Sequence, residues 1–418
     1  MDAAELGRRA REAAVVLAGA PAGLRTETLL ALAQEVRHRA PEVLDANARD
    51  VDAARRDGLG AAMLDRLALD AARLEAMARS VEAVAAQPDP VGVETARWSR
   101  PNGLDIARVR TPLGVVAVIY ESRPNVGLDA AALALRSANA LVLRGGSEAH
   151  GSALALHGAV AAALARSGLP AAAVQLAPST DRAWVGALLA GLDGAVDLLI
   201  PRGGRSLVER VRREARAPVL GHLEGLNHVF LHASADPRMA VEVTVDSKMR
   251  RVGVCGAAET LLVDAEAASR LLPPVAQALA ERGCELRADA AALRLIPSAT
   301  PAGATDWSTE HLAPVLNVAV VEGLEGALAH IGRYGSGHTD AIVAGDAATA
   351  AAFLARVDSA IVLHNASTQF ADGGEFGFGA EIGIATDKLH ARGPVGAEQL
   401  TTFKYVVRGS GQTRAAAM

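Results

Sequence analysis

The spacing of apolar and polar residues divides the chain into a helical start and a longer part that mixes strands with helices. Residues 1 to about 90 show helical spacing, and this pattern ends at a cluster of proline and glycine at 88–92. Residues 104–110 alternate as a strand does, whereas 114–120 and 140–143 are continuous apolar runs. Short unbroken runs of this kind are typical of strands that are buried on both faces.

The middle of the chain places helices and strands in turn. Helices are expected at 148–166 and 205–215, and strands are expected at 173–177, 196–200 and 228–232. This alternation predicts a parallel sheet covered by helices.

A second α/β block is expected to begin after the turn at Asp236 and Pro237. The tail from about 365 is rich in glycine and is expected to form loops, and 401–408 then alternates like an exposed strand. The second block is expected to contain a helix near 266–282 and strands near 259–263, 315–321, 341–343 and 360–363.

Length, charge and cysteine content narrow the class of protein. A chain of 418 residues favours two domains, and its net charge of −5 leaves no basic surface for nucleic acid. Two cysteines in so long a chain favour a reduced, cytoplasmic protein. The N-terminus lacks an export signal, and no apolar stretch reaches the roughly 18–20 residues of a membrane span, so a soluble protein is expected. The eleven histidines show no metal-ligand spacing, so no metal is expected.

Cys255 is the first candidate for chemistry. It lies between Gly253 and Gly256, after two arginines and before a strand-like run, as expected for a thiol displayed on a loop. A thiolate is the reactive form, and the nearby cations Lys248, Arg250 and Arg251 are expected to favour it. The alternative is a buried, inert cysteine.

Two strand-to-helix turns have the composition of phosphate-binding turns. Glycines let a ligand approach the backbone, the following helix offers free N–H groups, and arginine adds positive charge. Neither turn has the spacing of a dinucleotide fingerprint, so plain turn chemistry is the alternative. The candidate cofactor residues of the two turns are Arg144, Gly145 and Ser147, and Arg202, Gly203 and Gly204.

Asn125 follows a predicted buried strand, at the carboxyl edge where open α/β sheets bind ligands. Its amide is able to donate a hydrogen bond to an oxyanion. The alternative is an ordinary turn residue after Pro124.

Five ordered motifs together resemble gamma-glutamyl phosphate reductase, a branch of the aldehyde dehydrogenase superfamily. The resemblance covers nearly the whole chain from about residue 100. The motifs are the run from Thr111 to Asn125, the Leu-Arg-Gly-Gly-Ser-Glu-Ala run at 143–149, the cysteine loop at 250–263, Glu310-His-Leu-Ala-Pro, and Thr386-Asp-Lys-Leu-His-Ala-Arg-Gly-Pro-Val-Gly.

The resemblance implies a fold and a reaction. The fold is that of aldehyde dehydrogenases, α/β with a Rossmann-type cofactor domain, a catalytic domain and a small oligomerisation hairpin and tail. The reaction is the NADPH-dependent reduction of L-glutamate 5-phosphate to L-glutamate 5-semialdehyde, the second step of proline biosynthesis from glutamate. Cys255 would attack the acyl phosphate and form a thioester, and Asn125 would stabilise the oxyanion.

The resemblance also assigns cofactor residues. Arg144 replaces the usual lysine near the adenosine ribose, and Ser147 replaces an acidic residue that favours NAD. A positive and a neutral group there would tolerate a 2′-phosphate, which implies NADP(H). Glu310 matches the glutamate that holds the nicotinamide ribose.

One position bears on the type of reaction. Aldehyde-oxidising relatives carry a glutamate that activates water against the thioester, and our alignment places His222 there, which disfavours hydrolysis. A slip of two residues would place Glu224 there instead. An acid-forming aldehyde dehydrogenase and a catalytically silent cofactor-binding protein are therefore the alternatives.

A substrate with a carboxylate and a phosphoryl group requires cations. Arg123 and Arg392 are the favoured substrate-binding arginines because each lies in a matched motif, and His222 joins them. The chain departs from the common family pattern at Asn227, where a cysteine is frequent, and at Gly256, where an asparagine is frequent. The wider set of candidate cations is Arg123, Lys248, Arg251, Lys388, His390 and Arg392.

The expected domains follow from the same comparison. Residues 96–111 and 400–418 resemble strands that pair subunits in this superfamily, so a homodimer or homotetramer is expected. Glutamate 5-kinase, which makes the labile acyl phosphate, is a candidate partner. Residues 1–95 and 112–235, with part of 363–399, are expected to form the NADP-binding domain, and 236–362 the catalytic domain.

Overall fold

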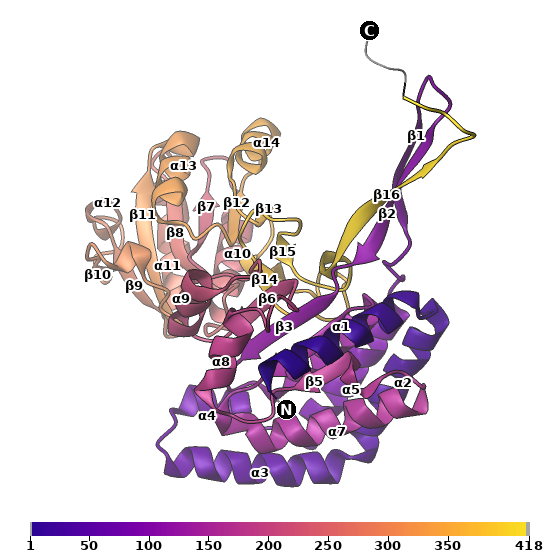
Figure 1. The fold of residues 1–418 in the computed structure, drawn as a ribbon. Helices are drawn as coiled ribbons and strands as arrows, with labels where there is room; N and C mark the ends of the chain where they lie inside the picture. The colour runs from indigo at the N-terminus through magenta and orange to yellow at the C-terminus, as the bar shows by residue number, and fades with distance from the viewer. Residues whose placement is uncertain (1, 415–418) are drawn as a thin grey trace.

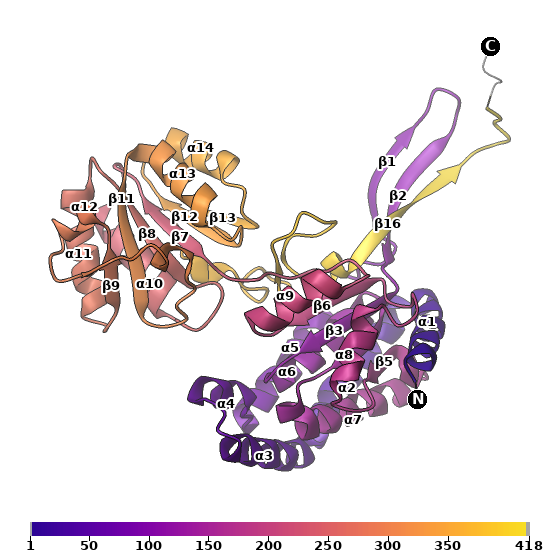
Figure 2. The same cartoon turned by 60° about the vertical axis from the view of Figure 1, so that its left-hand side comes forward.

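A computed structural model describes residues 2–414 and shows two α/β domains with a projecting arm (Figure 1). The first domain is built around a four-stranded parallel sheet, and the second around a seven-stranded parallel sheet. Figure 2 separates the two domains and shows the arm leaving the first of them. Among the described residues no single helix is long and apolar enough to cross a membrane. The two helices at 3–38 reach the length and apolar composition of a membrane span only when they are taken together, and they are bent sharply at the break between them.

The first sheet has the strand order β5-β4-β3-β6. Its central strand β3 is buried at every position, as the continuous apolar run predicted. All four strands lie where the hydrophobic pattern placed them. They are β3 (Val115–Tyr120), β4 (Ala140–Arg144), β5 (Val174–Leu176) and β6 (Leu198–Arg202).

Alanine-rich helices pack against this sheet and form one continuous core with it. Helix α6 starts with Pro124 at its first position, where the missing N–H costs nothing, and it buries Leu128, Leu133 and Leu135. Each such leucine contributes about 1.5–3 kcal/mol. The helices of this domain are α1 (Ala3–Gly19), α2 (Ala22–His38), α3 (Ala40–Arg56), α4 (Ala61–Leu67), α5 (Ala71–Ala86), α6 (Pro124–Arg136), η1 (Ser147–Ala149), α7 (His150–Arg166), η2 (Ala171–Ala173), α8 (Arg182–Leu189) and α9 (Arg205–Glu214).

The second sheet has the strand order β10-β9-β11-β8-β7-β12-β13, and all its pairs are parallel. Its strands are β7 (Asn227–Leu231), β8 (Ala258–Asp264), β9 (Glu285–Ala288), β10 (Thr300–Pro301), β11 (Val315–Val321), β12 (Thr339–Val343) and β13 (Ile361–His364). Its helices are α10 (Pro237–Met249), α11 (Ala268–Ala280), α12 (Ala290–Leu293), η3 (Asp306–Ser308), α13 (Gly323–Tyr334) and α14 (Ala347–Arg356).

The expected domain boundary at 235 is wrong. Strand β7, expected in the first sheet, lies between β8 and β12 of the second. The Asp236–Pro237 turn is a helix start, because the Asp236 carboxylate caps the Met239 N–H at 2.9 Å. Val219 still bridges to β6, so the chain crosses between the domains after residue 219 and before β7.

After β13 the chain returns to the first domain. Ala380, Ile382, Ala385 and Val395 are part of its core. This returning segment is mainly loop, as the glycine content predicted. Its short elements are η4 (Thr368–Phe370), β14 (Ile384–Ala385), β15 (Gly393–Pro394), which pairs antiparallel with β14, and η5 (Glu398–Leu400).

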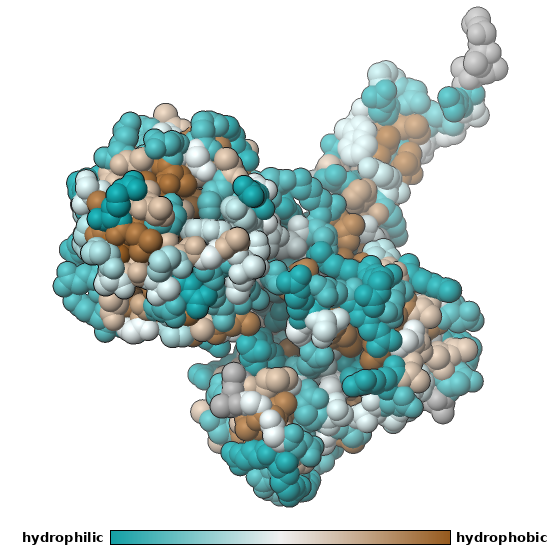
Figure 3. Space-filling view, turned by 90° about the vertical axis from the view of Figure 1, so that its left-hand side faces the viewer, coloured by the Kyte–Doolittle hydropathy of each residue, from teal (hydrophilic) through white to brown (hydrophobic). Residues whose placement is uncertain are grey.

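The arm is an antiparallel sheet of the order β1-β2-β16, formed by β1 (Glu94–Ser99), β2 (Asp105–Pro112) and β16 (Thr401–Arg408). Apolar side chains lie exposed along it (Figure 3). The predicted strand region was 400–418, and its last four residues, 415–418, lie outside the described residues. The exposed large side chains of the arm are Trp98, Phe403, Tyr405 and Val407.

Candidate active site

Cys255 lies on the loop between α10 and β8, partly buried, as a displayed thiol requires. The segment that crosses between the domains, residues 220–226, holds this loop together with Asn227, the first residue of β7. Asn227 Nδ2 donates to the Cys255 carbonyl at 2.6 Å and to the Ala257 carbonyl at 2.9 Å. A Cβ on Gly225 would lie 2.0 Å from the Cys255 carbonyl oxygen, so only glycine allows the two backbones to meet.

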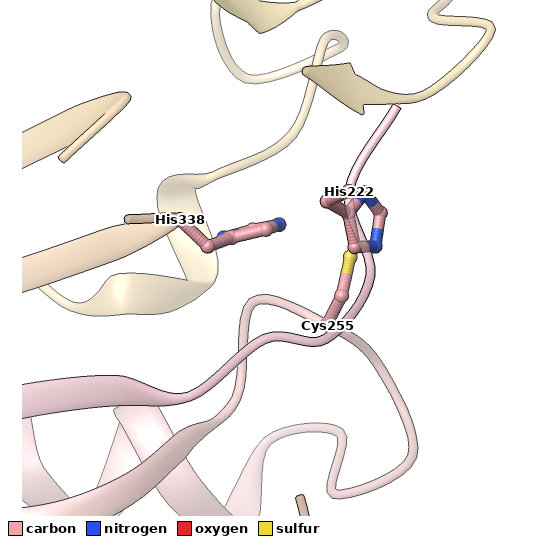
Figure 4. A group of neighbouring side chains, drawn as sticks. All are labelled: His222, Cys255 and His338. Carbon is pink, nitrogen blue, oxygen red and sulfur yellow. The ribbon is translucent and has the colours of Figure 1, made fainter. Parts of the chain in front are cut away.

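Two histidines flank the thiol (Figure 4). The nitrogens of His222 and His338 and the Cys255 sulfur all lie within 4.8 Å of one another. His222 comes from the crossing segment, and its Nδ1 lies 2.8 Å from the Ile384 carbonyl oxygen. His338 immediately precedes β12, is fully buried, and its Nδ1 lies 2.9 Å from Thr339 Oγ1.

The histidines change the acidity of the thiol. Burial alone would raise the pKa of Cys255, but the positive charge of His222, and then that of His338, brings this pKa well below its usual value. Burial pulls the pKa of His222 down, but the nearby thiolate outweighs it and raises that pKa. The pair therefore favours a thiolate beside an imidazolium, the arrangement that activates nucleophilic cysteines.

The expected role of lysine at the thiol is wrong. Lys248 is fully buried, and its Nζ binds Glu259 Oε2 at 2.8 Å. Arg250 approaches Asp246 at 4.0 Å. His338, which no motif singled out, takes the place of these cations, because topology brings the start of β12 to the cysteine loop.

Arginines from both domains surround the site. Burial, together with the positive charges of Arg202, Arg66 and Arg251, lowers the pKa of Arg123 to about 10, whereas the charge of Cys255 opposes this shift. Arg66 Nη2 donates to the Gly253 carbonyl at 3.1 Å. Within residues 2–414 the guanidinium groups of Arg123, Arg202 and Arg251 make no ion pair, and Arg202 Nε is buried without a partner.

Arg202 was expected to bind the cofactor from the second glycine turn, but its side chain extends away from that turn. A Cβ on Gly383 would meet Arg202 Cδ at 3.0 Å, and the charge of Arg202 acts on His222, Asp129 and Glu381. The side chain thus lies toward the thiol and the returning segment.

Asn125 lies in the first turn of α6, two residues after Arg123. Its Nδ2 donates to Asp129 Oδ2 at 3.0 Å, and burial raises the pKa of Asp129 to about 6. The oxyanion role of Asn125 stays a prediction, since the amide is directed to Asp129 here.

The first glycine turn follows β4. Arg144 Nη2 donates to the Thr180 carbonyl at 2.8 Å, and its Nε is buried without a partner in the described chain. A Cβ on Gly145 would lie 3.0 Å from the Tyr120 hydroxyl, so this turn packs closely on the sheet. Ser147 begins η1.

The second glycine turn leads into α9. The Gly204 N–H donates to Glu121 Oε2 at 2.9 Å, and a Cβ on Gly203 would lie 2.3 Å from the same oxygen. A carboxylate therefore accepts the N–H of Gly204, the residue before α9, whereas no side chain caps the first N–H groups of the helix.

Glu310 lies beside the crossing segment. Its Oε1 accepts the Gly225 N–H at 2.9 Å, and burial, partly opposed by that bond, raises its pKa. Glu224 forms an ion pair with Arg205, whereas His222 lies against the thiol. The structure thus brings His222, rather than Glu224, to Cys255.

Arg392 is not directed to the thiol. Its Nη1 binds Asp358 Oδ1 and its Nη2 the Asp358 carbonyl, both at 2.8 Å, and its Nε donates to the Thr386 carbonyl. Its donors are engaged with protein groups that tie the returning segment to the second domain. The expected substrate contact of Arg392 is therefore not supported by its geometry.

Glu381 is a second residue near the thiol that the sequence did not predict. Burial raises its pKa to about 7, with Arg202 lowering it and Cys255 raising it. It lies on the returning segment, whose glycines predicted only loops. Its Oε2 accepts the Gly373 N–H at 2.9 Å.

Comparisons with known proteins agree with this geometry. The model of the aldehyde dehydrogenase family matches residues 1–291. The gamma-glutamyl phosphate reductase of Caulobacter vibrioides is 67% identical over 411 residues, covering 98% of this chain and 100% of that protein. The corresponding protein of Brucella anthropi is 56% identical over 98% of this chain and 96% of its own length.

Solved structures agree as well. The gamma-glutamyl phosphate reductase of Thermotoga maritima superposes with a TM-score of 0.96 at 40% identity, covering 99% of this chain and 100% of that one. An acetylating aldehyde dehydrogenase from Geobacillus thermoglucosidasius, 17% identical with a TM-score of 0.69 and covering 99% and 98% of the two chains, shares the fold. The resemblance found in the motifs is thereby confirmed, and the chain belongs to the gamma-glutamyl phosphate reductases within the aldehyde dehydrogenase family.

Proposed function

We propose that this protein reduces L-glutamate 5-phosphate to L-glutamate 5-semialdehyde with NADPH and releases inorganic phosphate. The observation that carries the proposal is the thiol of Cys255 between two histidines, beside arginines that have no ion-pair partner within residues 2–414. The reductases that match nearly the whole chain support it.

Cys255 would act as the nucleophile and His222 as the base. Cys255 Sγ bonds to the acyl carbon, the bond from that carbon to the phosphate oxygen breaks, and phosphate leaves a thioester behind. His222 is the base that holds the thiol proton, because its pKa is raised beside the thiolate. That proton would then go to the departing phosphate. Addition of a hydride to the acyl carbon would convert the thioester to a hemithioacetal alkoxide on Cys255, which collapses to the aldehyde and the Cys255 thiolate.

Arg123, Arg202 and Arg251 would bind the anionic groups of the substrate. A phosphoryl group and a carboxylate are both ligands for guanidinium forks. Arg123 is the strongest candidate because it is half-buried, has no ion-pair partner in the described chain, and lies within range of the thiol's charge. The donors of Arg392 are already engaged.

The fold implies a nicotinamide cofactor, and we propose NADP(H) in particular. When bound, this cofactor supplies the hydride. Arg144, with its unpartnered buried Nε, and Ser147 fit a 2′-phosphate, since neither repels an anion. The turn at Gly203 and Gly204 would accept the pyrophosphate once Glu121 releases the Gly204 N–H, and Glu310 would hold the nicotinamide ribose.

We also propose a homodimer or homotetramer that assembles through the arm. Strands β1 and β16 are the outer strands of its sheet, and each has an unpaired edge within the described chain. Exposed edges of this kind pair with other chains unless they are protected.

The reverse reaction tests the function and avoids the labile acyl phosphate. NADP⁺ reduction would be followed with glutamate semialdehyde, with and without inorganic phosphate. We expect turnover only with phosphate, because phosphate must attack the thioester. Turnover without phosphate would identify an acid-forming dehydrogenase, and no turnover in either tube would contradict the proposed substrate.

Two cysteine variants accompany this assay. Cys255→Ala should abolish turnover but keep cofactor binding. Cys284→Ala removes a buried thiol of the second core and should remain active. An active Cys255→Ala variant would overturn the nucleophile assignment.

A further inference from the structure

We propose that His222, Cys255 and His338 form a binding site for Zn²⁺, and that occupation of this site reversibly inhibits the enzyme. The proposal rests on the proposed function only for the inhibition. The metal site itself stands on the geometry of the three side chains.

The chemistry of the three ligands suits zinc. One thiolate and two imidazoles are ligands that Zn²⁺ prefers, and three protein ligands leave a fourth position for water. All three ligand atoms lie within 4.8 Å of one another. A tetrahedral zinc with bonds of about 2.0–2.3 Å separates its ligands by about 3.5 Å, so closure requires side-chain movements of roughly an ångström.

Both histidines are already oriented for a metal. His222 Nδ1 faces the Ile384 carbonyl, which only accepts a hydrogen bond, so this nitrogen keeps its proton. Nε2 is the nitrogen that would bind the metal, and its proton would be released on binding. Outer partners of this kind fix the ring of a zinc-bound histidine.

His338 provides the independent observation. Its side chain is fully buried, its Nδ1 is engaged by Thr339 Oγ1, and its Nε2 has no partner in the described chain. An unpartnered buried nitrogen beside a thiol is costly, and a metal ion would satisfy it.

The charges around the three ligands determine how tightly the site would hold a cation. The positive charge of Arg123 lies near the sulfur and disfavours a bound cation. The carboxylates of Glu310 and Glu381 also lie near the thiol, and their negative charge favours a bound cation. The site lacks a fourth protein ligand among the residues described. We therefore infer a reversible inhibitory ion rather than a permanent structural one.

The consequence follows from the shared thiolate. A sulfur bonded to zinc cannot attack an acyl carbon and resists alkylation. Zinc should therefore inhibit competitively with the acyl substrate and protect Cys255 from iodoacetamide, whether or not cofactor is present.

Equilibrium dialysis of the full chain against ZnCl₂, after treatment with a chelator that is then removed, measures binding without any turnover. We expect one zinc per chain and one sulfur in its coordination sphere by X-ray absorption. Alkylation of Cys255 should stop at saturation and return after EDTA. Zinc that binds without sulfur, or that leaves alkylation unchanged, would overturn the proposal.

Variants assign the ligands. Cys255→Ser, His222→Ala and His338→Ala should each raise the dissociation constant for zinc at least about tenfold, since losing even an outer partner costs 10–100-fold. His390→Ala is the matched control, because His390 is exposed and contacts only the Gln399 carbonyl. Circular dichroism would show whether each variant folds. If one variant fails to fold, the other two still test the zinc ligands.

The two proposals fail in distinguishable ways. If the unchanged chain shows no phosphate-dependent turnover of glutamate semialdehyde but binds one zinc through sulfur, the proposed function fails while the zinc site stands. If His222→Ala and His338→Ala bind zinc as tightly as the unchanged chain, the metal site fails while the reductase stands.

Discussion

The reactivity of Cys255 depends on His338, a residue that carries no motif. Its charge is one of two that bring the pKa of the thiol well below its usual value. The thiolate exists above that pKa, so lowering it extends reactivity to lower pH. The sequence offered no signal for His338, because a histidine before a strand gains this role only when β12 lies beside β7.

Replacing His338 with alanine should therefore shift the pH profile of thiol alkylation upward. The pKa of Cys255 would rise toward its ordinary value, and the thiolate fraction at neutral pH falls about tenfold for each unit by which the pKa then exceeds the pH. Iodoacetamide labelling of Cys255, followed by mass spectrometry over a pH series, measures the shift. An unchanged midpoint in His338→Ala, with His390→Ala as control, would contradict the assignment.

Arg123 should determine affinity for phosphate. Charged hydrogen bonds contribute about 1.5–3 kcal/mol, so Arg123→Gln should raise the KM for phosphate in the reverse reaction about 10- to 100-fold. Cofactor binding should not change. Arg55→Gln, at an exposed arginine of α3 that pairs only with Asp52, is the control. Equal KM values in the two variants would remove Arg123 from the substrate site.

At the scale of elements, the crossing segment positions the thiol. Asn227, where a cysteine is frequent in the family, donates to two carbonyls of the cysteine loop and accepts the Thr339 N–H at 3.1 Å. One amide thus fixes both the Cys255 loop and the start of β12. The side chain of Asn227 thus makes three hydrogen bonds around the site.

Gly225→Ala tests this contact between segments. Its Cβ would lie 2.0 Å from the Cys255 carbonyl oxygen, which must force the loop away, and a displacement of about 1 Å can lower a rate about 100-fold. We expect a fall in kcat of about that size. Gly186→Ala is the control, because a Cβ there meets nothing within 4 Å. Normal turnover in Gly225→Ala would show that the loop position is not critical.

Local patterns predicted the strands well, but they did not show which sheet each strand joins. The apolar runs at 114–120 and 315–321 closely match β3 and β11, since burial on both faces leaves a continuous pattern. Strand β7 has the same pattern, so nothing local showed that it pairs with β8. Cys255 emerged from an ordered motif and His222 from the alignment with the water-activating glutamate of aldehyde-oxidising relatives. The side chain of Arg202 leaves the turn in which it was expected to bind the cofactor.

At the scale of the whole molecule, the site lies between the carboxyl ends of the first-sheet strands and the amino ends of the second-sheet strands. Arg123 and Arg202 follow the carboxyl ends of β3 and β6, whereas Cys255, Asn227 and His338 lie at the amino ends of second-sheet strands. Ligand sites of open α/β sheets are sought at carboxyl ends, which explains why the second-sheet residues were harder to find. Both domains therefore contribute charges to one thiol.

The arm extends this argument to assembly, because it exposes apolar side chains on strands that no other part of the described chain covers. Val407 on β16 is 54% exposed, and Val16 on α1 is 50% exposed, which makes the two valines a matched pair. If the arm pairs subunits, Val407→Asp places a charge in a buried interface and should lower the molar mass seen by light scattering, whereas Val16→Asp should not. A monomeric unchanged chain, or an oligomer that both variants leave intact, would contradict assembly through β16.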